Sequence, residues 1–198
     1  SQLASTFMST PSSPLHVRWL GRVPYSEALA VQHAVFEHGI DQHLLLVEHQ
    51  HVFTYGQNAN LEQNLKCDPA LVGAELVAVH RGGDITYHGP GQLVGYPLLN
   101  LSAKHGESGP ADTSAYIHDV EQLIIDTLDE LGLSNASRKR DFPGVWLDAE
   151  TSEARKICAI GVRVARGSSE RRTMHGFALN VTTDLSYMRE HIVPCGIA

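Results

Sequence analysis

The sequence predicts an α+β fold, on three observations. Segments with the alternating or continuously apolar pattern of strands outnumber the segments with helical periodicity. Hairpin-like strand pairs mingle along the chain with two long helices, which is typical of the α+β class. No internal repeat or linker divides the 198 residues. A single domain of this length buries roughly 70% of the surface of its unfolded chain, enough for a substantial core.

The N-terminal half is predicted to hold one helix among strands. Residues 1–14 are rich in Ser, Thr and Pro and carry no charge, which predicts a disordered tail. A helix is expected from Pro24 to His38, where Gly39 would end it. Apolar runs predict strands at Leu15–Leu20, Leu44–Val47, Val52–Tyr55, Leu76–Val79 and Leu93–Leu99.

The C-terminal half is predicted to contain a helix and a hairpin. Thr113 is expected to cap a helix that ends at Gly132. A hairpin is expected from Ile157–Val164 and Thr173–Val181 around a polar turn, followed by an amphipathic segment from Asp184 to His191. The apolar stripe predicted to face the core from the helix is Ile117, Val120, Ile124, Leu128 and Leu131.

A glycine-rich segment separates two of the predicted strands. Its glycines permit positive φ angles and carry no Cβ, while Pro90 fixes its own φ, so backbone N–H groups are free to hold a carbonyl oxygen or an anion. A simple turn is the alternative. The segment reads Arg81-Gly82-Gly83-Asp84-Ile85-Thr86-Tyr87-His88-Gly89-Pro90-Gly91-Gln92.

Composition excludes several classes of protein. No apolar run approaches the ~20 residues that span a bilayer, and no secretory signal pattern opens the sequence. Cys67, Cys158 and Cys195 are odd in number and lack C-x-x-C spacing, which indicates free thiols in a reducing, cytoplasmic setting. His49 and His51 would share a strand face, but without a recognisable third ligand we expect surface or core histidines rather than zinc.

Charge is distributed unevenly within a net charge of −7. Residues 138–172 hold nine Lys and Arg against five Asp and Glu, a local charge of +4 that leaves −11 on the remainder. This asymmetry indicates an acidic partner, with a solvated basic hairpin as the alternative. Nucleic acid is disfavoured because the whole chain is acidic and no basic motif is interleaved with aromatic residues.

Three further segments complete a family resemblance. Together with the glycine-rich segment they closely resemble the signature segments of the octanoyl (lipoyl) transferases, over residues from about Leu15 to the end. The resemblance implies the fold of biotin protein ligase and lipoate ligase catalytic domains, a mixed β-sheet backed by helices. Family members usually continue further, so we expect 15–198 to be one catalytic domain truncated at its C-terminus. The segments are Lys156-Ile157-Cys158-Ala159-Ile160-Gly161, His175-Gly176-Phe177-Ala178-Leu179-Asn180 and Pro194-Cys195-Gly196.

The resemblance implies a catalytic dyad of Cys195 and Lys156. A free cysteine has a pKa near ~8.5, so a nearby cation is needed to stabilise its thiolate, and the same lysine can carry protons. On residue type alone, Cys195 is more often a small buried residue and Lys156 a solvated strand residue. Cys158 is expected on the same strand face as Lys156, where packing is favoured over a second nucleophile. Cys67 is expected to be incidental.

The resemblance also implies an acyl-binding site. His88 and an accessory His175 each adjoin a glycine, which favours a pocket wall, with structural hydrogen bonding as the alternative. Small residues leave room for an eight-carbon chain, and backbone N–H groups can stabilise an oxyanion. The implied substrate-binding residues are Arg81, Gly82, Gly83, Asp84, Ile85, Thr86, Tyr87, His88, Ala159, Ile160, Gly161, Gly176, Phe177 and Ala178.

The function implied is octanoyl (or lipoyl) transfer in lipoate biosynthesis. The acyl group would come from the phosphopantetheine of acyl carrier protein, pass through a thioester on Cys195 and reach a lysine of a lipoyl domain. Acceptors would be 2-oxoacid dehydrogenase E2 subunits and the glycine cleavage H protein. No further cofactor and no metal are expected.

Three other functions stay open at this point. They are an ATP-dependent lipoate ligase on the same fold, a non-catalytic module that binds the carrier protein, and a histidine-based metallohydrolase.

Acyl carrier proteins are typically acidic, so the positive segment suggests a docking surface formed by Arg163, Arg166, Arg171 and Arg172.

Overall fold

The computed structural model describes residues 14–101, 112–166 and 171–194, and it contains two sheets rather than the one sheet expected. The larger sheet has the strand order β1-β2-β6-β11-β10-β9-β8, with β7 paired to β11. The smaller has the order β4-β3-β5. One pair in each sheet, β1–β2 and β3–β4, is parallel and the other pairs are antiparallel, so both sheets are mixed.

The strands include every one that the sequence predicted. Those of the larger sheet are β1 (Leu15–Val23), β2 (Gln42–His49), β6 (Gln92–Leu98), β7 (Asn100–Leu101), β8 (Ala136–Lys139), β9 (Phe142–Leu147), β10 (Arg155–Arg166) and β11 (Arg171–Asn180). Those of the smaller sheet are β3 (Val52–Tyr55), β4 (Glu75–Ala78) and β5 (Ile85–His88).

The helices include the two long ones expected, with corrections at one of them. Asp112, not Thr113, caps α3, because its carboxylate accepts a hydrogen bond from the N–H of Ala115. Leu131 follows the helix and is 74% exposed, so it does not belong to the core stripe. The described helices are α1 (Tyr25–His38), α2 (Leu61–Asn64), the 3₁₀ turn η1 (Pro69–Val72), α3 (Thr113–Glu130) and α4 (Ser186–His191).

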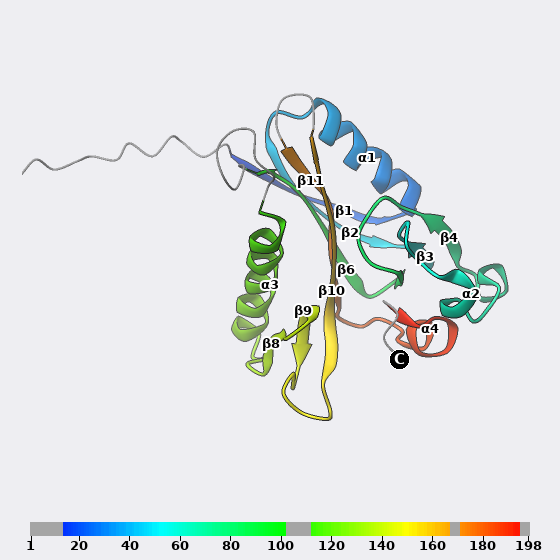
Figure 1. The fold of residues 1–198 in the computed structure, drawn as a ribbon. Helices are drawn as coiled ribbons and strands as arrows, with labels where there is room; N and C mark the ends of the chain where they lie inside the picture. Colours follow the sequence, from blue (N-terminus) through cyan, green and yellow to red (C-terminus); the bar gives the residue numbers. More distant parts are fainter. Residues whose placement is uncertain (1–13, 102–111, 167–170, 195–198) are drawn as a thin grey trace, which may run out of the picture.

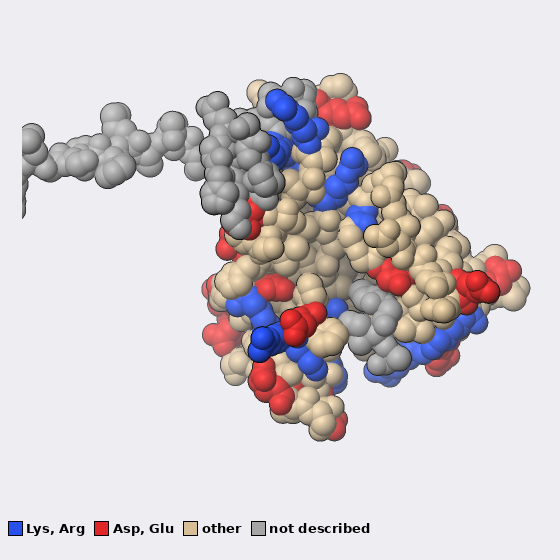
Figure 2. Space-filling view, in the orientation of Figure 1, with Lys and Arg blue, Asp and Glu red and all other residues tan. Residues whose placement is uncertain are grey.

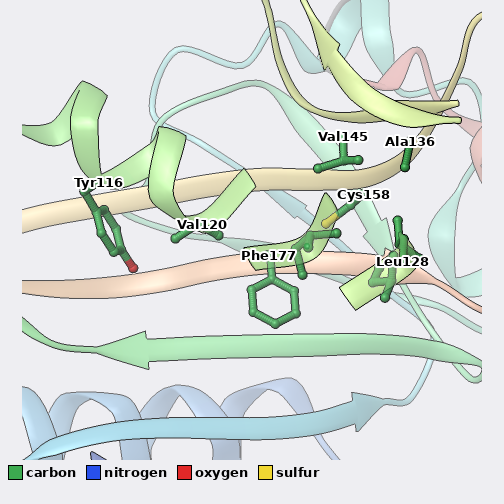
Figure 3. Close-up of a cluster of buried hydrophobic side chains, with 9 residues drawn as sticks. Tyr116, Val120, Leu128, Ala136, Val145, Cys158 and Phe177 are labelled. Carbon is green, nitrogen blue, oxygen red and sulfur yellow. The ribbon is translucent and has the colours of Figure 1, made fainter. Parts of the chain in front are cut away.

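The larger sheet separates two layers (Figure 1). On one face α3 packs Tyr116, Val120 and Leu128 into an apolar cluster with Val145 and Cys158 (Figure 3). On the other face lie α1 and the smaller sheet. Successive side chains of β2 and β6 point alternately into the two layers, so the larger sheet is buried on both of its faces.

Four of the described strands escaped prediction, namely β5, β7, β8 and β9. The strand β5 lies inside the glycine-rich segment, which is therefore a strand between two turns rather than one loop. Its pattern has the period of a strand, since Ile85 and Tyr87 are fully buried in the core of the smaller sheet. The sequence did not predict the hairpin β8–β9, because Ser137 to Lys139 are polar and half-exposed and so lack the apolar pattern of a strand.

Both chain connections described between the two sheets, and the link from β11 to α4, meet at Gly91. The turn from β5 to β6 contains Gly91 itself, at φ +81°. Glu48, near the end of β2 where the chain passes to β3, accepts a hydrogen bond from the Gly91 N–H. The link from β11 to α4 donates to the Gly91 carbonyl from the N–H groups of Val181 and Thr182 and from the Thr183 hydroxyl. A Cβ at Gly91 would lie 2.6 Å from Thr182, so only glycine fits this junction.

Candidate active site

A cavity of about 250 Å³ opens between the two sheets. Figure 2 shows that this side of the molecule is hollowed at its centre, with charged side chains around the hollow. The walls come from β5, from the strands of the larger sheet, and from α4 and the residues after it. The lining residues are Thr86, Gln92, Trp146, Lys156, Ala159, Ala178, Asn180, Met188 and Pro194.

A second cavity, of about 60 Å³, adjoins the first. The two share Thr86, Ala159 and Ala178, so they lie next to each other on either side of these residues. Small and apolar residues dominate their walls, which suits a hydrocarbon chain. The other residues of the second cavity are Tyr25, Arg81, Gly82, Gly83, His88, Val94, Tyr96, Ile160, Gly161, His175, Gly176 and Phe177.

Most of the substrate-binding residues predicted from the sequence thus line one cavity or the other. Asp84, Ile85 and Tyr87 do not, which corrects the expectation for these three. In β5 Thr86 and His88 face the cavities, while Ile85 and Tyr87 face the core of the smaller sheet. The Asp84 carboxylate is occupied by the Ile85 N–H and the Asn64 amide.

A β-bulge decides which side chains of β10 reach the cavity. Lys156 pairs with Trp146 and Cys158 with Val145, so Ile157 is an extra residue in the pairing of β10 with β9. The bulge reverses the alternation of faces. Lys156 and Ala159 therefore line the cavity, whereas Cys158 lies on the α3 face, and the expectation that Lys156 and Cys158 share a face is wrong.

Two neighbours on β9 position Lys156. Its ammonium lies 4.9 Å from the centre of the Trp146 ring, a cation–π contact. Gly144 has a φ of +115°, and a Cβ there would lie 2.5 Å from the Cys158 carbonyl oxygen and 3.5 Å from Cδ and Cε of Lys156. Sequence reasoning missed both residues. The available signal was a glycine inside an alternating strand pattern, which often marks a close approach.

The two cysteines that the structure describes are poor nucleophiles. Cys158 is 0% exposed (Figure 3), and burial raises the pKa of its thiol to about 12. Burial also raises the pKa of Cys67, with a further contribution from the charge of Asp68. Cys195 lies outside the described residues, but Pro194, which precedes it, lines the cavity together with Lys156.

A chain of hydrogen bonds connects the two cavities. Arg81 donates to the Thr54 hydroxyl at 3.0 Å, and that hydroxyl lies 3.5 Å from Nε2 of His88. Nδ1 of His88 donates to the side-chain oxygen Oε1 of Gln92 at 2.8 Å, and the side-chain amide of Gln92 donates to Oδ1 of Asn180 at 3.0 Å. Burial lowers the pKa of His88 to about 3, so this imidazole is neutral at neutral pH.

His175 lines the second cavity in a strained conformation. Its φ is +59°, unusual for a residue other than glycine, and its N–H donates to the buried Gln32 side chain. Burial first, and then the charge of Arg81, lower the pKa of His175 to about 4. A neutral imidazole therefore faces the cavity at neutral pH.

The histidines considered as zinc ligands have other partners. His49 donates from Nδ1 to the Val23 carbonyl and accepts from the Tyr96 hydroxyl at Nε2. Nδ1 of His51 lies 2.8 Å from the Tyr87 hydroxyl. Within residues 14–101, 112–166 and 171–194, no group of three His, Cys, Asp or Glu side chains is placed to hold a metal ion.

The proposed docking arginines do not form one exposed set. Arg172 is 3% exposed, and its guanidinium donates to the carbonyls of Gly39, Asp41 and Leu98. It therefore holds the connection from α1 to β2 and must be removed from the set. Arg166 is exposed, and Arg163 and Arg171 are partly exposed. Among the helices described here, none is long and apolar enough to cross a membrane.

Sequence comparison identifies relatives along most of the chain. Residues 24–197 match the family of the lipoyl protein ligase A/B catalytic domain. The octanoyltransferase of Solibacter usitatus is 46% identical over 187 residues, which cover 91% of this chain and 78% of the relative. The octanoyltransferase of Salinispora arenicola is 43% identical over 195 residues, 96% of this chain and 84% of the relative.

Solved structures share the fold at low sequence identity. The bipartite lipoate protein ligase of Thermoplasma acidophilum, studied with its E2 lipoyl domain, superposes with a TM-score of 0.70 at 20% identity, covering 91% of this chain and 66% of the other. A lipoate-protein ligase A bound with ATP superposes with a TM-score of 0.66 at 19% identity, covering 91% and 71%. The expected resemblance to lipoate ligase catalytic domains is thereby confirmed.

Proposed function

This chain belongs to the lipoyl protein ligase A/B catalytic domain family and is an octanoyltransferase, and we propose that it transfers the octanoyl group through a thioester on Cys195. The donor is octanoyl acyl carrier protein, and the acceptor is a lysine of a lipoyl domain, such as that of a 2-oxoacid dehydrogenase E2 subunit or the glycine cleavage H protein. The observation that carries this proposal is that Lys156 and Pro194, the residue before Cys195, line the same cavity.

The first half-reaction forms the acyl-enzyme. The Cys195 thiolate attacks the carbonyl carbon of the donor thioester, and the C–S bond to pantetheine breaks as the tetrahedral intermediate collapses. The departing pantetheine sulfur takes a proton from the Lys156 ammonium. Because burial keeps the Cys158 thiol protonated, and Cys158 lies on the far side of the sheet, the acyl group does not transfer to it.

The second half-reaction returns the proton. The lysine of the lipoyl domain attacks as a neutral amine, having given its first proton to water. Its nitrogen bonds to the acyl carbon, the neutral Lys156 amine takes the second proton from that nitrogen, and the C–S bond breaks with Cys195 leaving as a thiolate. Meanwhile the hydrocarbon tail occupies the space of the two adjacent cavities. Burial of each methylene contributes about 0.8 kcal/mol, so the depth of that space favours chains that fill it.

A mass measurement tests the thioester. The enzyme, incubated with octanoyl acyl carrier protein and no acceptor, should gain one octanoyl mass on the peptide that contains Cys195, and hydroxylamine should remove it. Cys195→Ser should abolish the adduct, whereas Cys67→Ser, at a half-buried thiol far along the chain, should retain it. Full transfer activity in Cys195→Ser would refute the mechanism.

A ligase reaction is the alternative that the fold leaves open, since a structural relative binds ATP. A ligase would activate a free acid as an acyl-adenylate and would not need Cys195. Octanoyl transfer from the carrier protein should proceed without ATP, and free octanoate with ATP should give no product. The opposite pattern would favour the ligase.

A further inference from the structure

We propose that Asn64 is a positioning residue that holds the segment before Cys195 against the glycine-rich segment through Asp84. The proposal rests on the proposed function, because it concerns the approach of the chain to the nucleophile. It involves described residues only, and it assigns a role to Asp84, whose carboxylate lines neither cavity.

The backbone after α4 is paired with the backbone after α2. Leu65 and Ile192 form an antiparallel bridge. The Lys66 N–H donates to the His191 carbonyl at 2.9 Å, and the Val193 N–H donates to the Asn64 carbonyl at 2.8 Å. Ile192 is 1% exposed, so the pairing is also sealed by apolar contact. The last hydrogen bond therefore lies one residue before Pro194, at the wall of the cavity.

The side chain of Asn64 extends this pairing to the glycine-rich segment. Its amide donates to one oxygen of the Asp84 carboxylate at 2.6 Å, and the other oxygen accepts from the Ile85 N–H at 2.7 Å. Hydrogen bonds to an ionised group are shorter and stronger than neutral ones. Asp84 thus uses both oxygens to connect the start of β5 with Asn64.

These bonds form a continuous path across the site. Thr86, two residues after Asp84, lines both cavities, and Pro194 lines the larger one. Asn64 consequently holds β5, the strand that carries Thr86, and the chain leading to Cys195 in one relative position. A displacement of about 1 Å in reacting groups can cost on the order of 10²-fold in rate, so this bond bears on acylation and not only on stability.

An exchange of the two side chains provides the test. Asn64→Asp places two carboxylates face to face, and we expect it to slow octanoyl-thioester formation on Cys195 by about 10- to 100-fold. Asp84→Asn retains an acceptor for Ile85 and an amide for position 64, so adding it to Asn64→Asp should restore most of the rate. Asn64→Ala, which removes the bond without adding charge, should lie between them.

A matched control comes from α3, on the opposite face of the larger sheet. The Gln122 amide donates to Asp126 at 2.6 Å, so Gln122→Glu makes the same change from amide to carboxylate at the same distance. It should leave thioester formation unchanged. The rate of alkylation of Cys195 by iodoacetamide, measured in the same variants, should follow the thioester rate.

The outcomes separate this inference from the proposed function. If Asn64→Asp and Asn64→Ala keep both rates within twofold while only the unfolding temperature changes, or if the exchanged pair recovers nothing, the positioning role is refuted. If the unaltered enzyme forms no thioester, the proposed function fails. The alkylation rates would then still decide whether Asn64 governs the position of Cys195.

Discussion

Lys156 makes its cation–π contact with one of only two tryptophans in the chain. Trp146 is buried in the wall of the cavity, while Trp19 lies on β1 with 58% of its surface exposed. A contact of this kind contributes about 0.5 to 2 kcal/mol, more when water is excluded. The tryptophan therefore restricts the lysine ammonium to the part of the cavity beside the indole ring.

Replacing Trp146 with leucine should reduce turnover more than it reduces donor affinity. We expect kcat to fall by about 3- to 30-fold, the rate equivalent of that contact, with KM for octanoyl carrier protein changed little. Trp146→Phe should recover part of the loss. Trp19→Leu is the control and should behave as the unaltered enzyme in steady-state assays; equal defects in both variants would show that the contact has no catalytic role.

Buried neutral histidines make the fold sensitive to acid. His88 and His175 have pKa values of about 3 and about 4, whereas in the unfolded chain each takes up a proton below about 6.5. The free energy of unfolding should therefore be at its full value above pH 6.5 and fall as the pH decreases. Between pH 6.5 and 5 the loss is up to about 2 kcal/mol for each histidine.

Thermal unfolding measured at pH 7.5 and pH 5 tests this dependence. His175→Asn, which tolerates the positive φ, should lose less stability on acidification than the unaltered protein. The exposed His38 offers the comparison, since His38→Asn should show the same acid dependence as the parent. Identical pH profiles in all three proteins would mean that other groups dominate.

Lys156, His88 and His175 were predictable as residues of the site because each lies in a recognisable string of residues. Trp146, Asn180 and Met188 were not predicted as site residues, although they line the same cavity. Their proximity depends on the order β6-β11-β10-β9 and on the packing of α4, which no local pattern in their own segments encodes. The assignment of Cys195 stays a prediction.

At the scale of elements, strand positions were predictable and strand registers were not. Period-two patterns located β10 and β11 to within a few residues. The bulge at Ile157 depends instead on how β9 pairs with β10, and it reversed the predicted face of Cys158. Counting alternate residues along a strand fails wherever the partner strand inserts such an irregularity.

At the same scale, we expect Gly144 to determine how closely β9 and β10 can pair. Gly144→Ala combines an unfavourable φ with a 2.5 Å approach to the Cys158 carbonyl, so we expect a loss of about 1 to 3 kcal/mol in stability and reduced turnover. Gly132, at φ +90° with nothing within 4 Å, isolates the backbone contribution. In denaturant unfolding, Gly132→Ala should lose less stability than Gly144→Ala, and its turnover should be unaltered. Equal losses of stability in the two variants would show that the close approach to the Cys158 carbonyl has no effect.

At the scale of the whole molecule, the described parts of the proposed site are held by different sheets. Lys156 belongs to β10 of the larger sheet, while α4, which leads to Pro194, packs against the smaller sheet. Tyr187 of α4 stacks on Tyr87 at 4.7 Å and on His51 at 4.5 Å, and its hydroxyl donates to the Val72 carbonyl. The reaction therefore depends on how the two sheets are held relative to each other.

Docking of the acyl carrier protein should involve Arg163, which is partly exposed, and Arg166, which is exposed, near the end of β10. The double variant Arg163→Glu, Arg166→Glu should raise KM for octanoyl carrier protein by about 3- to 10-fold at low salt, since rim charges act on the rate of encounter. The defect should shrink at ~0.15 M salt, where the screening length is about 8 Å. Steady-state kinetics at two ionic strengths measure the effect.

Two comparisons isolate docking from other causes. Octanoyl pantetheine lacks the acidic protein, so the double variant should process it normally. Arg18→Glu alters an exposed arginine on β1, which three strands separate from β10, and should leave KM for the carrier protein unchanged. If the double variant loses activity with both donors, its arginines support the fold or the acyl site, and the docking role must be abandoned.

Three segments of the chain converge on Gly91. Its N–H is taken by Glu48 of β2, and its carbonyl accepts from Val181, Thr182 and Thr183 after β11, so this one backbone unit joins parts of the chain that are far apart in sequence. A Cβ at Gly91 would meet Thr182, so any substitution there should disturb the ends of β2, β5, β6 and β11 together, and with them both walls of the cavity.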